Sequence, residues 1–324
     1  MDYLSRITAP IENELNDLRK ILDKSFISSS PALQNVLDYI HARKGKMMRP
    51  ILVLLVSKAF DSINQRSLNS AATIELLHTA SLVHDDVVDE SLERRGQAST
   101  NAIYNNKISI LIGDYLLSTS LLHASLTSDI RIISKVSELG KTLASGEIIQ
   151  LSAVSEDQIS EDVYFEIISK KTAELFATCA EIGAMSVNAS ELFTEKARLF
   201  GYYLGICFQI KDDIFDYFDN VNIGKPTGND MIEGKLTLPA IYILNHFHDP
   251  EMLSIAYDIK ALKASRADIQ RLVEYVKSKG GIDYAEDVMN DYYQRAKDLI
   301  SFFPNKEIQV ALITYLEYVV NRTK

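Results

Sequence analysis

Two short acidic runs constrain this chain more than any other feature. Each has the form Asp-Asp-x-x-Asp, and they lie at 85–89 and 212–216, inside apolar stretches with helical periodicity. Residues three and four positions apart on a helix share one face, so the aspartates of each run project together. Because unpaired buried charge is costly, we expect both runs to line a polar cavity inside a helical protein.

A bound cation would turn the repulsion within each run into attraction. Carboxylates suit Mg²⁺, a hard ion that keeps some waters and is usually completed by substrate phosphates. A single run would fit a solvated face equally well, but two runs followed by basic residues favour a site. Zinc is disfavoured because neither His78 nor His84 has a second His or Cys at a zinc-like spacing. The candidate metal ligands are Asp85, Asp86, Asp89, Asp212, Asp213 and Asp216.

Basic residues lie in turns and at helix ends around the acidic runs. Arg forks and Lys point charges are the side chains that diphosphate oxygens require. The chain has no Gly-x-Gly-x-x-Gly, and its Gly228 to Lys235 stretch does not match a P-loop, so we expect metal and side chains to bind the phosphate. The expected 67–90 helix has two stripes: an apolar one of Ala72, Leu76, Ala80, Val83 and Val87, and a polar one of His78, Ser81, Asp85 and Asp89. His78 is therefore interpreted as a hydrogen-bond donor to a diphosphate, whereas His84 is assigned no role beyond structure. The basic candidates are Lys46, Arg49, Arg94, Arg95, Lys171, Lys225 and Lys235.

Helical periodicity dominates the chain, and alternating strand patterns are almost absent. With 324 residues, 47% of them hydrophobic, and no linker or repeat, residues 1–324 are predicted to form a single all-α domain. We expect about ten to thirteen helices around a central cavity, with the two acidic helices facing each other across it. The expected helices are 4–23, 31–43, 49–62, 67–90, 98–122, 128–152, 160–187, 191–219, 235–247, 266–279, 281–301 and 305–322, with turns at 94–96, 224–228 and 279–281. Because glycine weakens a helix, Gly201 and Gly205 in the 191–219 helix predict close approach of another helix or a ligand.

Composition excludes several classes of function. The formal charge of −10 argues against bulk nucleic-acid binding, which needs a basic surface. Cys179 and Cys207 lie in apolar helical stretches, so we expect buried free thiols in a reducing compartment. The N-terminus lacks an apolar signal-peptide core, and the longest apolar runs, such as 51–56, are too short to span a bilayer. We therefore expect a cytoplasmic protein without a transmembrane segment.

Several segments resemble those of the trans-isoprenyl diphosphate synthases, also called polyprenyl synthetases. They follow the family order over roughly residues 40–240, and the resemblance is strongest to long-chain bacterial members that make quinone side chains. The segments that carry it are Gly45-Lys46-x-x-Arg49-Pro50, Glu75 to His84 before the first acidic run, Arg94-Arg95-Gly96, Gly113-Asp114, Gly146-Glu147, Lys171-Thr172-Ala173, Phe208 to Lys211 before the second run, Gly224-Lys225-Pro226, and Asp230 with Gly234-Lys235-x-Thr237-Leu238-Pro239.

The resemblance implies a homodimeric, Mg²⁺-dependent transferase that condenses isopentenyl diphosphate with an allylic prenyl diphosphate. Asp85, Asp89 and Asp212 would coordinate Mg²⁺, with the other three aspartates in support. The residues implied for the allylic diphosphate are Arg94, Lys171, Thr172, Gln209, Lys225 and Lys235, and those for isopentenyl diphosphate are Lys46, Arg49, His78 and Arg95. Met47 stands where the family usually has Arg, so one diphosphate contact is missing or supplied elsewhere. Ala98 replaces a Pro found in many members, a change expected to be harmless.

Product length is expected to depend on the helix that leads into the first acidic run. In the family, bulky aromatics four and five residues before the first Asp stop chain growth early. This chain has the small residues Ala80 and Ser81 there, with Leu77 one turn further away, and we expect a product of about six to ten isoprene units. The alternatives are a shorter-chain farnesyl or geranylgeranyl diphosphate synthase, a class I terpene cyclase, a regulatory subunit of a heteromeric synthase, and a purely structural acidic bundle.

Overall fold

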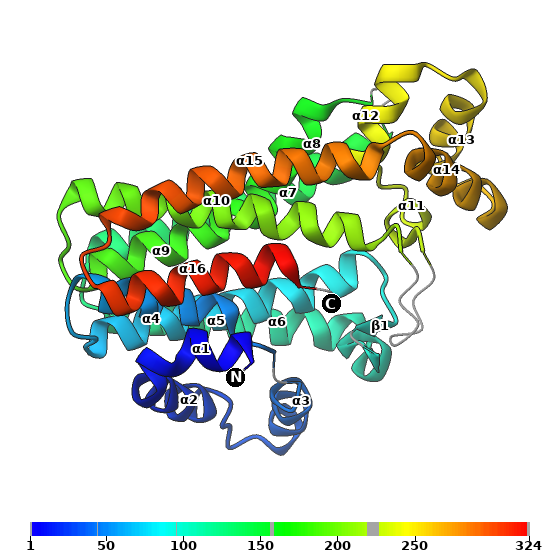
Figure 1. The fold of residues 1–324 in the computed structure, drawn as a ribbon. Helices are drawn as coiled ribbons and strands as arrows, with labels where there is room; N and C mark the ends of the chain where they lie inside the picture. The colour runs from blue at the N-terminus through cyan, green and yellow to red at the C-terminus, as the bar shows by residue number, and fades with distance from the viewer. Residues whose placement is uncertain (1, 44, 95, 156–158, 219–226, 323–324) are drawn as a thin grey trace. The chain divides into compact units, whose positions relative to one another are not determined.

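The computed structural model describes residues 2–43, 45–94, 96–155, 159–218 and 227–322, and these are helical almost throughout (Figure 1). By its internal contacts the chain divides into two compact units. Unit 1 contains Met1–Glu138, Thr178–Arg198 and Ile300–Tyr315, and unit 2 contains Leu139–Ala177, Leu199–Leu299 and Leu316–Lys324. The all-α fold is confirmed, while the single domain and the two facing acidic helices stay predictions.

Unit 1 is built from the N-terminal half of the chain. Its elements are α1 (Tyr3–Thr8), the 3₁₀ turn η1 (Ala9–Ile11), α2 (Glu12–Ser25), α3 (Pro31–His41), α4 (Met48–Phe60), α5 (Gln65–Val88), β1 (Glu93–Arg94), β2 (Gln97–Ala98), α6 (Thr100–Leu126) and the 3₁₀ turn η3 (Ile300–Phe302). Parts of α7 (Ile130–Ser155), α9 (Glu174–Ser186), α10 (Glu191–Phe215) and α16 (Lys306–Asn321) complete it.

Helix α5 carries the first acidic run and packs along α6. It begins at Asn64, whose side chain accepts hydrogen bonds from the backbone N–H groups of Arg66 and Ser67 in a capping box. The apolar stripe predicted on this helix is buried at Ala72, Leu76, Ala80 and Val83. A capped start and a buried apolar face hold the acidic end of the helix in a defined position.

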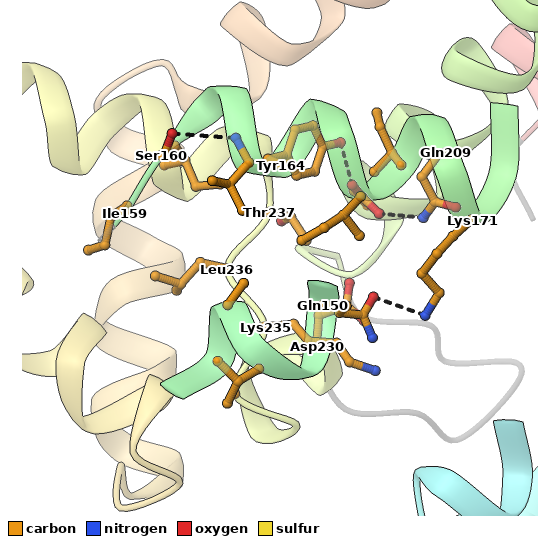
Figure 2. A pocket seen from close by; sticks show the side chains of 18 of the residues that line it. Gln150, Ile159, Ser160, Tyr164, Lys171, Gln209, Asp230, Lys235, Leu236 and Thr237 are labelled. Carbon is orange, nitrogen blue, oxygen red and sulfur yellow. Dashed lines mark hydrogen bonds between the residues drawn. The ribbon is translucent and has the colours of Figure 1, made fainter. Parts of the chain in front are cut away.

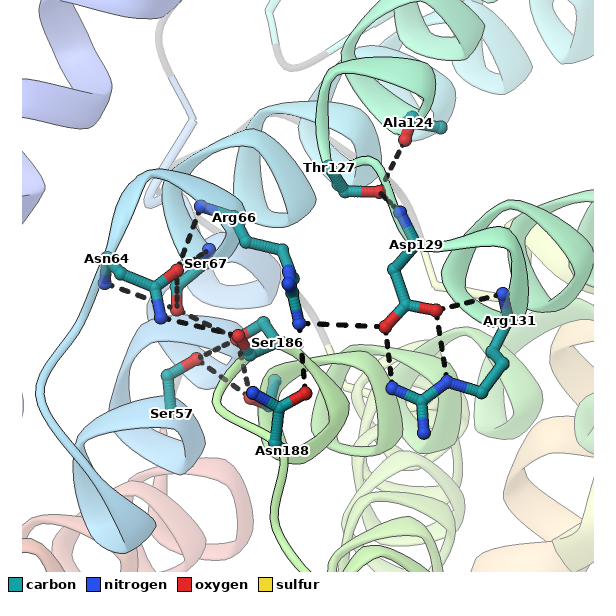
Figure 3. Close-up of polar contacts among 11 residues, drawn as sticks. Ser57, Asn64, Arg66, Ser67, Ala124, Thr127, Asp129, Arg131, Ser186 and Asn188 are labelled. Atoms are coloured by element: carbon teal, nitrogen blue, oxygen red, sulfur yellow. Dashed lines mark hydrogen bonds and ion pairs between the residues drawn. The ribbon is translucent and has the colours of Figure 1, made fainter.

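A polar cluster secures helix ends within unit 1 (Figure 3). The Asp129 carboxylate accepts two hydrogen bonds from the Arg131 guanidinium, at 3.0 and 2.6 Å, and Arg66 Nη1 lies 3.7 Å from it. Arg66 also donates to Asn188 at the end of α9. The hydrogen bond from Arg131 holds the pKa of the buried Asp129 below its usual value. The start of α5, the α6–α7 turn and the end of α9 are thereby joined.

A two-residue hairpin follows α5. Glu93 pairs with Ala98 and Arg94 with Gln97, and Gly96 supplies a φ of +75° in the turn between them. Such a backbone conformation favours glycine. The turn predicted at Arg94-Arg95-Gly96 is confirmed at Gly96, while Arg95 lies outside the described residues.

Unit 2 contains the second acidic run. Its remaining elements are α8 (Glu161–Ile168), the π-helical segment η2 (Ser169–Ala173), α11 (Asn229–Ile232), α12 (Leu238–Phe247), α13 (Pro250–Lys260), α14 (Arg266–Ser278) and α15 (Gly281–Leu299). Buried side chains of α12, α13 and α14, such as Leu244, Ala256 and Leu272, form one apolar cluster with Tyr217 and Met231. This cluster supports the end of α10, where the acidic run stands.

Two glycines of α10 permit close helix packing. A Cβ at Gly201 would meet the Phe176 carbonyl oxygen, and one at Gly205 would lie 2.6 Å from Ala173 Cα. The close approach predicted at these glycines is confirmed, and the neighbouring segment is η2 with the start of α9.

Several predicted helix boundaries were wrong. The expected 160–187 helix is interrupted by the π-helical η2, and α10 ends at Phe215 rather than near 219. Helix α13 was not predicted; it begins at the N-cap Asp249. The two-residue strands were not predicted either. These differences arise where capping, insertion of one residue or tertiary contacts outweigh apolar periodicity.

Both cysteines are buried and free, as predicted. By length and composition, one helix within the described ranges, α6, qualifies as a membrane span. Part of α6 is buried inside unit 1, and core helices of globular proteins pass the same test. The absence of a transmembrane segment therefore stays a prediction.

Candidate active site

Both acidic runs stand at the C-terminal end of a helix. Asp85 and Asp86 occupy the last turn of α5, and Asp89 is its C-cap residue. Asp212 and Asp213 occupy the last turn of α10, and Asp216 follows its final residue. The unsatisfied carbonyls at this end of a helix carry partial negative charge. Carboxylates are electrostatically unfavourable there, and a cation would relieve both sources of repulsion.

Asp86 is the buried member of the first run. Its carboxylate is almost fully enclosed, and Arg94 Nε of β1 lies 2.5 Å from Oδ1. Burial raises the pKa of Asp86, and the Arg94 guanidinium opposes this shift. The hairpin therefore places Arg94, the arginine predicted to contact the allylic diphosphate, next to the first acidic run.

Asp213 is the buried member of the second run. The Tyr164 hydroxyl donates to its Oδ2 at 2.5 Å, and Gln209 Nε2 donates to its Oδ1 at 2.8 Å. The pKa of Asp213 is raised to about 7, chiefly by burial and in part by the neighbouring Asp212 and Asp216 charges, while the hydrogen bonds from Tyr164 and Gln209 oppose the shift. Burial and the neighbouring carboxylates thus both favour the protonated form of Asp213.

Asp212 and Asp216 have different partners. Arg322, near the C-terminus, places Nη2 at 2.7 Å from Asp212 Oδ1, while its guanidinium lies over the Phe208 ring. The Asp216 carboxylate accepts from the backbone N–H groups of Asn229 and Asp230 at the start of α11. Asp216 thus orients α11 and, with it, the side chain of Asp230.

Lys171 lies on the π-helical segment η2, a local geometry common at functional sites. Its ammonium group lies 2.5 Å from the Glu147 carboxylate and donates to Gln150 Oε1 at 3.0 Å. A Cβ at Gly146 would lie 2.8 Å from Lys170 Cβ, so glycine is required for η2 to approach α7. The Gly146-Glu147 pair therefore positions the lysine.

A pocket of about 260 Å³ lies within unit 2 (Figure 2). Its lining combines polar side chains with apolar ones such as Val154, Val163 and Leu236. Thr172 Oγ1 donates to Gln209 Oε1 at 2.7 Å, and the Lys235 ammonium lies 2.7 Å from Glu233. Of the predicted site residues, this pocket brings together Lys171, Thr172, Gln209, Asp213 and Lys235.

Among the other predicted site residues that the structure describes, Asp212 and Asp216 belong to unit 2 and the rest to unit 1. Lys46 is exposed just before α4, Arg49 is half-buried in its first turn, and His78 is half-buried on α5. Met47, at the position where Arg was expected, is the N-cap of α4 with a φ of 51°. Arg95 and Lys225 lie outside the described residues, so their predicted roles stay predictions.

The residues predicted to control product length are enclosed. Ala80 and Leu77 are buried, and Ser81 is half-buried with its hydroxyl donating to the His78 carbonyl. Small side chains therefore occupy the interior of unit 1 one turn before the first acidic run.

Three contributors were not found from the sequence. Tyr164 and Arg322 had no assigned role, and Glu147 was noted only as part of a motif. A signal existed for Tyr164, which precedes Lys171 by seven residues and so shares its helical face. Nothing near Arg322 in the sequence indicates that it contacts Asp212.

The donor set fits Mg²⁺. Within the described ranges, no three His, Cys, Asp or Glu side chains converge on one metal position. Mg²⁺ needs only one or two protein carboxylates, because waters and substrate phosphates fill the rest of its shell. Half-buried Asp85, Asp212 and Asp216 supply such oxygens at helix ends where a cation is favoured.

The chain is similar to known proteins over most of its length. The family model for polyprenyl synthetases matches residues 30–276. Octaprenyl diphosphate synthase of Haemophilus influenzae is 32% identical over 296 residues, covering 91% of this chain and 90% of that protein. A solved structure of geranylgeranyl pyrophosphate synthase from Bacteroides thetaiotaomicron is 50% identical, with a TM-score of 0.88 and coverage of 99% and 100%.

A second similar structure is named for a longer product. Decaprenyl diphosphate synthase from Rhodobacter capsulatus is 29% identical, with a TM-score of 0.93 over 99% of each chain. The fold agrees between this chain and both solved structures, while the named products of the similar proteins differ in length. The chain therefore belongs to the polyprenyl synthetase family and is a prenyltransferase with the all-α fold of that family.

Proposed function

We propose that this prenyltransferase condenses isopentenyl diphosphate with an allylic prenyl diphosphate to make a long all-trans polyprenyl diphosphate. The observation that carries the proposal is the pocket of unit 2, which is lined by Lys171, Thr172, Gln209 and Lys235 together with the buried Asp213 of the second acidic run. Cationic and hydrogen-bonding side chains beside an acidic helix end fit a diphosphate bound with Mg²⁺.

The proposed roles follow the predicted residues. Asp85, Asp89 and Asp212 hold Mg²⁺, with Asp86, Asp213 and Asp216 in support. The allylic diphosphate is contacted by Arg94, Lys171, Thr172, Gln209, Lys225 and Lys235, and isopentenyl diphosphate by Lys46, Arg49, His78 and Arg95. Arg94 donates through Nε to Asp86, and its guanidinium carries four further N–H groups for a diphosphate.

Bound Mg²⁺ supplies Lewis-acid stabilisation of the departing diphosphate. The chain's own cations stabilise the same developing charge as the allylic C–O bond breaks. The residues that bind isopentenyl diphosphate hold its double bond beside the allylic cation, which converts a two-substrate collision into an oriented step. A proton then leaves to the released diphosphate, and the product has grown by one five-carbon unit.

A long product is favoured by Ala80 and Ser81, the small residues before the first acidic run. The similar octaprenyl and decaprenyl synthases agree with this length, whereas the 50% identical structure is named for a shorter, geranylgeranyl product. A shorter-chain synthase is therefore the second candidate. A quinone side chain is the destination we propose for the long product.

We also infer that a second copy of this chain covers part of α6. This helix exposes a run of apolar side chains, a feature typical of protein interfaces. They include Ile103, Ile110, Leu111, Leu121, Leu122 and Leu126. Sedimentation equilibrium of the wild type and of Leu122→Glu tests this inference, since a dimer should be weakened by the introduced charge. The cytoplasm is the proposed location, in agreement with the two free buried thiols.

Incubation of the purified chain with farnesyl diphosphate, isopentenyl diphosphate and Mg²⁺ tests the proposed activity. Mass analysis should show prenyl diphosphates of increasing length that end at a long product, and chelation of Mg²⁺ by EDTA should stop their formation. A terpene cyclase would consume farnesyl diphosphate without isopentenyl diphosphate, and a regulatory subunit would elongate nothing on its own. Either result would reject the proposal.

A further inference from the structure

Tyr164 has no assigned part in the proposed activity, yet it binds a residue of the second acidic run. Its side chain is 6% exposed and that of Asp213 is similarly enclosed. The tyrosine hydroxyl donates to Asp213 Oδ2 at 2.5 Å, and Gln209 Nε2 donates to the other oxygen at 2.8 Å. A buried carboxylate needs such donors, and each fixes its orientation.

The contacts continue from Asp213 to the lysine-bearing segment. Gln209 Oε1 accepts from Thr172 Oγ1 at 2.7 Å, and Thr172 follows Lys171 on η2. The amide of Gln209 is thus engaged at both ends, which also settles its orientation. Asp213 is therefore held by two elements of unit 2: α8 through Tyr164, and η2 through Gln209. Tyr164 and Gln209 are labelled in Figure 2.

Helix α8 is itself firmly placed. The Ser160 side chain caps its start by accepting from the Val163 backbone N–H. In its first turn, Glu161 accepts a hydrogen bond of 2.7 Å from the Tyr284 hydroxyl of α15. A short helix fixed in this way is a rigid support for the Tyr164 hydroxyl.

We propose that Tyr164 is a positioning residue of the second acidic run. Its hydroxyl orients the Asp213 carboxylate and thereby the C-terminal end of α10, where Asp212 stands in the last turn and Asp216 follows the final residue. The proposal rests on the proposed function, because it assigns Tyr164 to the binding of Mg²⁺ with the allylic diphosphate. If Tyr164 only filled the core, loss of its hydroxyl would leave metal binding unchanged.

The test is Tyr164→Phe, with Tyr284→Phe as a matched control. Each substitution removes one tyrosine hydroxyl that links α8 to another element through a carboxylate. Tyr164 of α8 donates to Asp213 of the acidic run, whereas Tyr284 donates to Glu161 of α8. Mn²⁺ serves as the probe, and its binding is measured calorimetrically in the presence of an unreactive thiolo analogue of farnesyl diphosphate. We expect Tyr164→Phe to weaken Mn²⁺ binding about tenfold, equivalent to about 1.4 kcal/mol. Tyr284→Phe should bind Mn²⁺ like the wild type.

Steady-state kinetics give a second readout. In Tyr164→Phe the KM for the allylic substrate should rise about fivefold to tenfold, while the KM for isopentenyl diphosphate should not change. Unaltered Mn²⁺ binding in Tyr164→Phe, even with a lower melting temperature, would overturn the proposal. Equal weakening in both variants would overturn it as well, because it would assign the effect to α8 as a whole.

A second comparison covers the case in which Tyr164→Phe does not fold. The double variant Tyr164→Phe/Asp213→Asn carries no buried carboxylate at this position, and its reference is Asp213→Asn alone. If Tyr164 acts through Asp213, both should bind Mn²⁺ equally and at least fivefold more weakly than the wild type. A difference between them, or wild-type affinity in either, would reject the inference. If the wild type elongates farnesyl diphosphate and Tyr164→Phe binds Mn²⁺ normally, the positioning role fails while the proposed function stands.

Discussion

Arg322 holds Asp212, placing Nη2 at 2.7 Å from Oδ1 with its guanidinium over the Phe208 ring. A cation from the end of the chain thus neutralises the first aspartate of the second acidic run. Asp212 is also the residue of this run proposed to hold Mg²⁺. The guanidinium and the metal therefore compete for one carboxylate.

Replacing Arg322 with Gln should strengthen binding of Mg²⁺ to the substrate-free protein. The physical reason is the removal of a competing positive charge next to Asp212. The half-saturating Mg²⁺ concentration, measured by calorimetry, should fall about threefold to tenfold. Lys211→Gln is the control. Lys211 lies on α10, the helix of Asp212, with its ammonium group over the Phe215 ring, and the substitution removes one positive charge as Arg322→Gln does. Equal effects of the two variants would assign the change to net charge rather than to the pair.

Replacing Glu147 with Gln should weaken binding of the allylic substrate. Glu147 lies 2.5 Å from the Lys171 ammonium and fixes its position next to the pocket. The KM for the allylic diphosphate should rise about threefold to tenfold, with a smaller change in the KM for isopentenyl diphosphate. Glu166→Gln is the matched control, since Glu166 pairs with the adjacent Lys170 at the surface. An unchanged allylic KM in Glu147→Gln would contradict the prediction.

Replacing Ala80 with Phe should shorten the product. Ala80 is buried one turn before the first acidic run, so a phenyl ring there occupies interior space. Mass analysis of the products made from farnesyl diphosphate and isopentenyl diphosphate measures the change. Ser81→Phe is the companion variant, and its effect should be in the same direction. If there is no cavity at this place, the ring overpacks the core, and Ala80→Phe loses about 1–3 kcal/mol of stability without a change in product length.

His123 should make the stability of the protein depend on pH. Its ring nitrogens lie 2.9 Å from Ser25 Oγ and 3.2 Å from Asn69 Oδ1, and burial lowers its pKa below the usual value. The unfolded chain therefore binds a proton more readily than the folded one. Stability is then retained at neutral pH and lost as the pH falls through the unfolded pKa, by at most about 1.4 kcal/mol per pH unit.

The comparison of His123→Gln with the wild type tests this dependence. Urea unfolding between about pH 7.5 and pH 5 should show a smaller loss of unfolding free energy in the variant. His246→Gln changes an exposed histidine and should keep the wild-type slope. A His123→Gln slope equal to that of the wild type would refute the assignment.

The sequence by itself determined the helical class and the residues of the acidic runs. Apolar periodicity and run spacing are local properties, so most helices and the close approach at Gly201 could be predicted. It did not determine where helices stop: α10 ends at Phe215, and η2 interrupts an apparently continuous helix. Those boundaries depend on caps and on a residue inserted into the hydrogen-bond ladder, which periodicity does not report.

Only the tertiary structure decided which partners the buried charges have. Tyr164 meets Asp213, Glu147 meets Lys171 and Arg322 meets Asp212 across long stretches of sequence. A buried carboxylate or ammonium must find donors or counter-charges, but helix packing decides which distant residue supplies them. Local sequence motifs thus determine which chemical groups the site contains, whereas contacts between helices far apart in the chain determine its geometry.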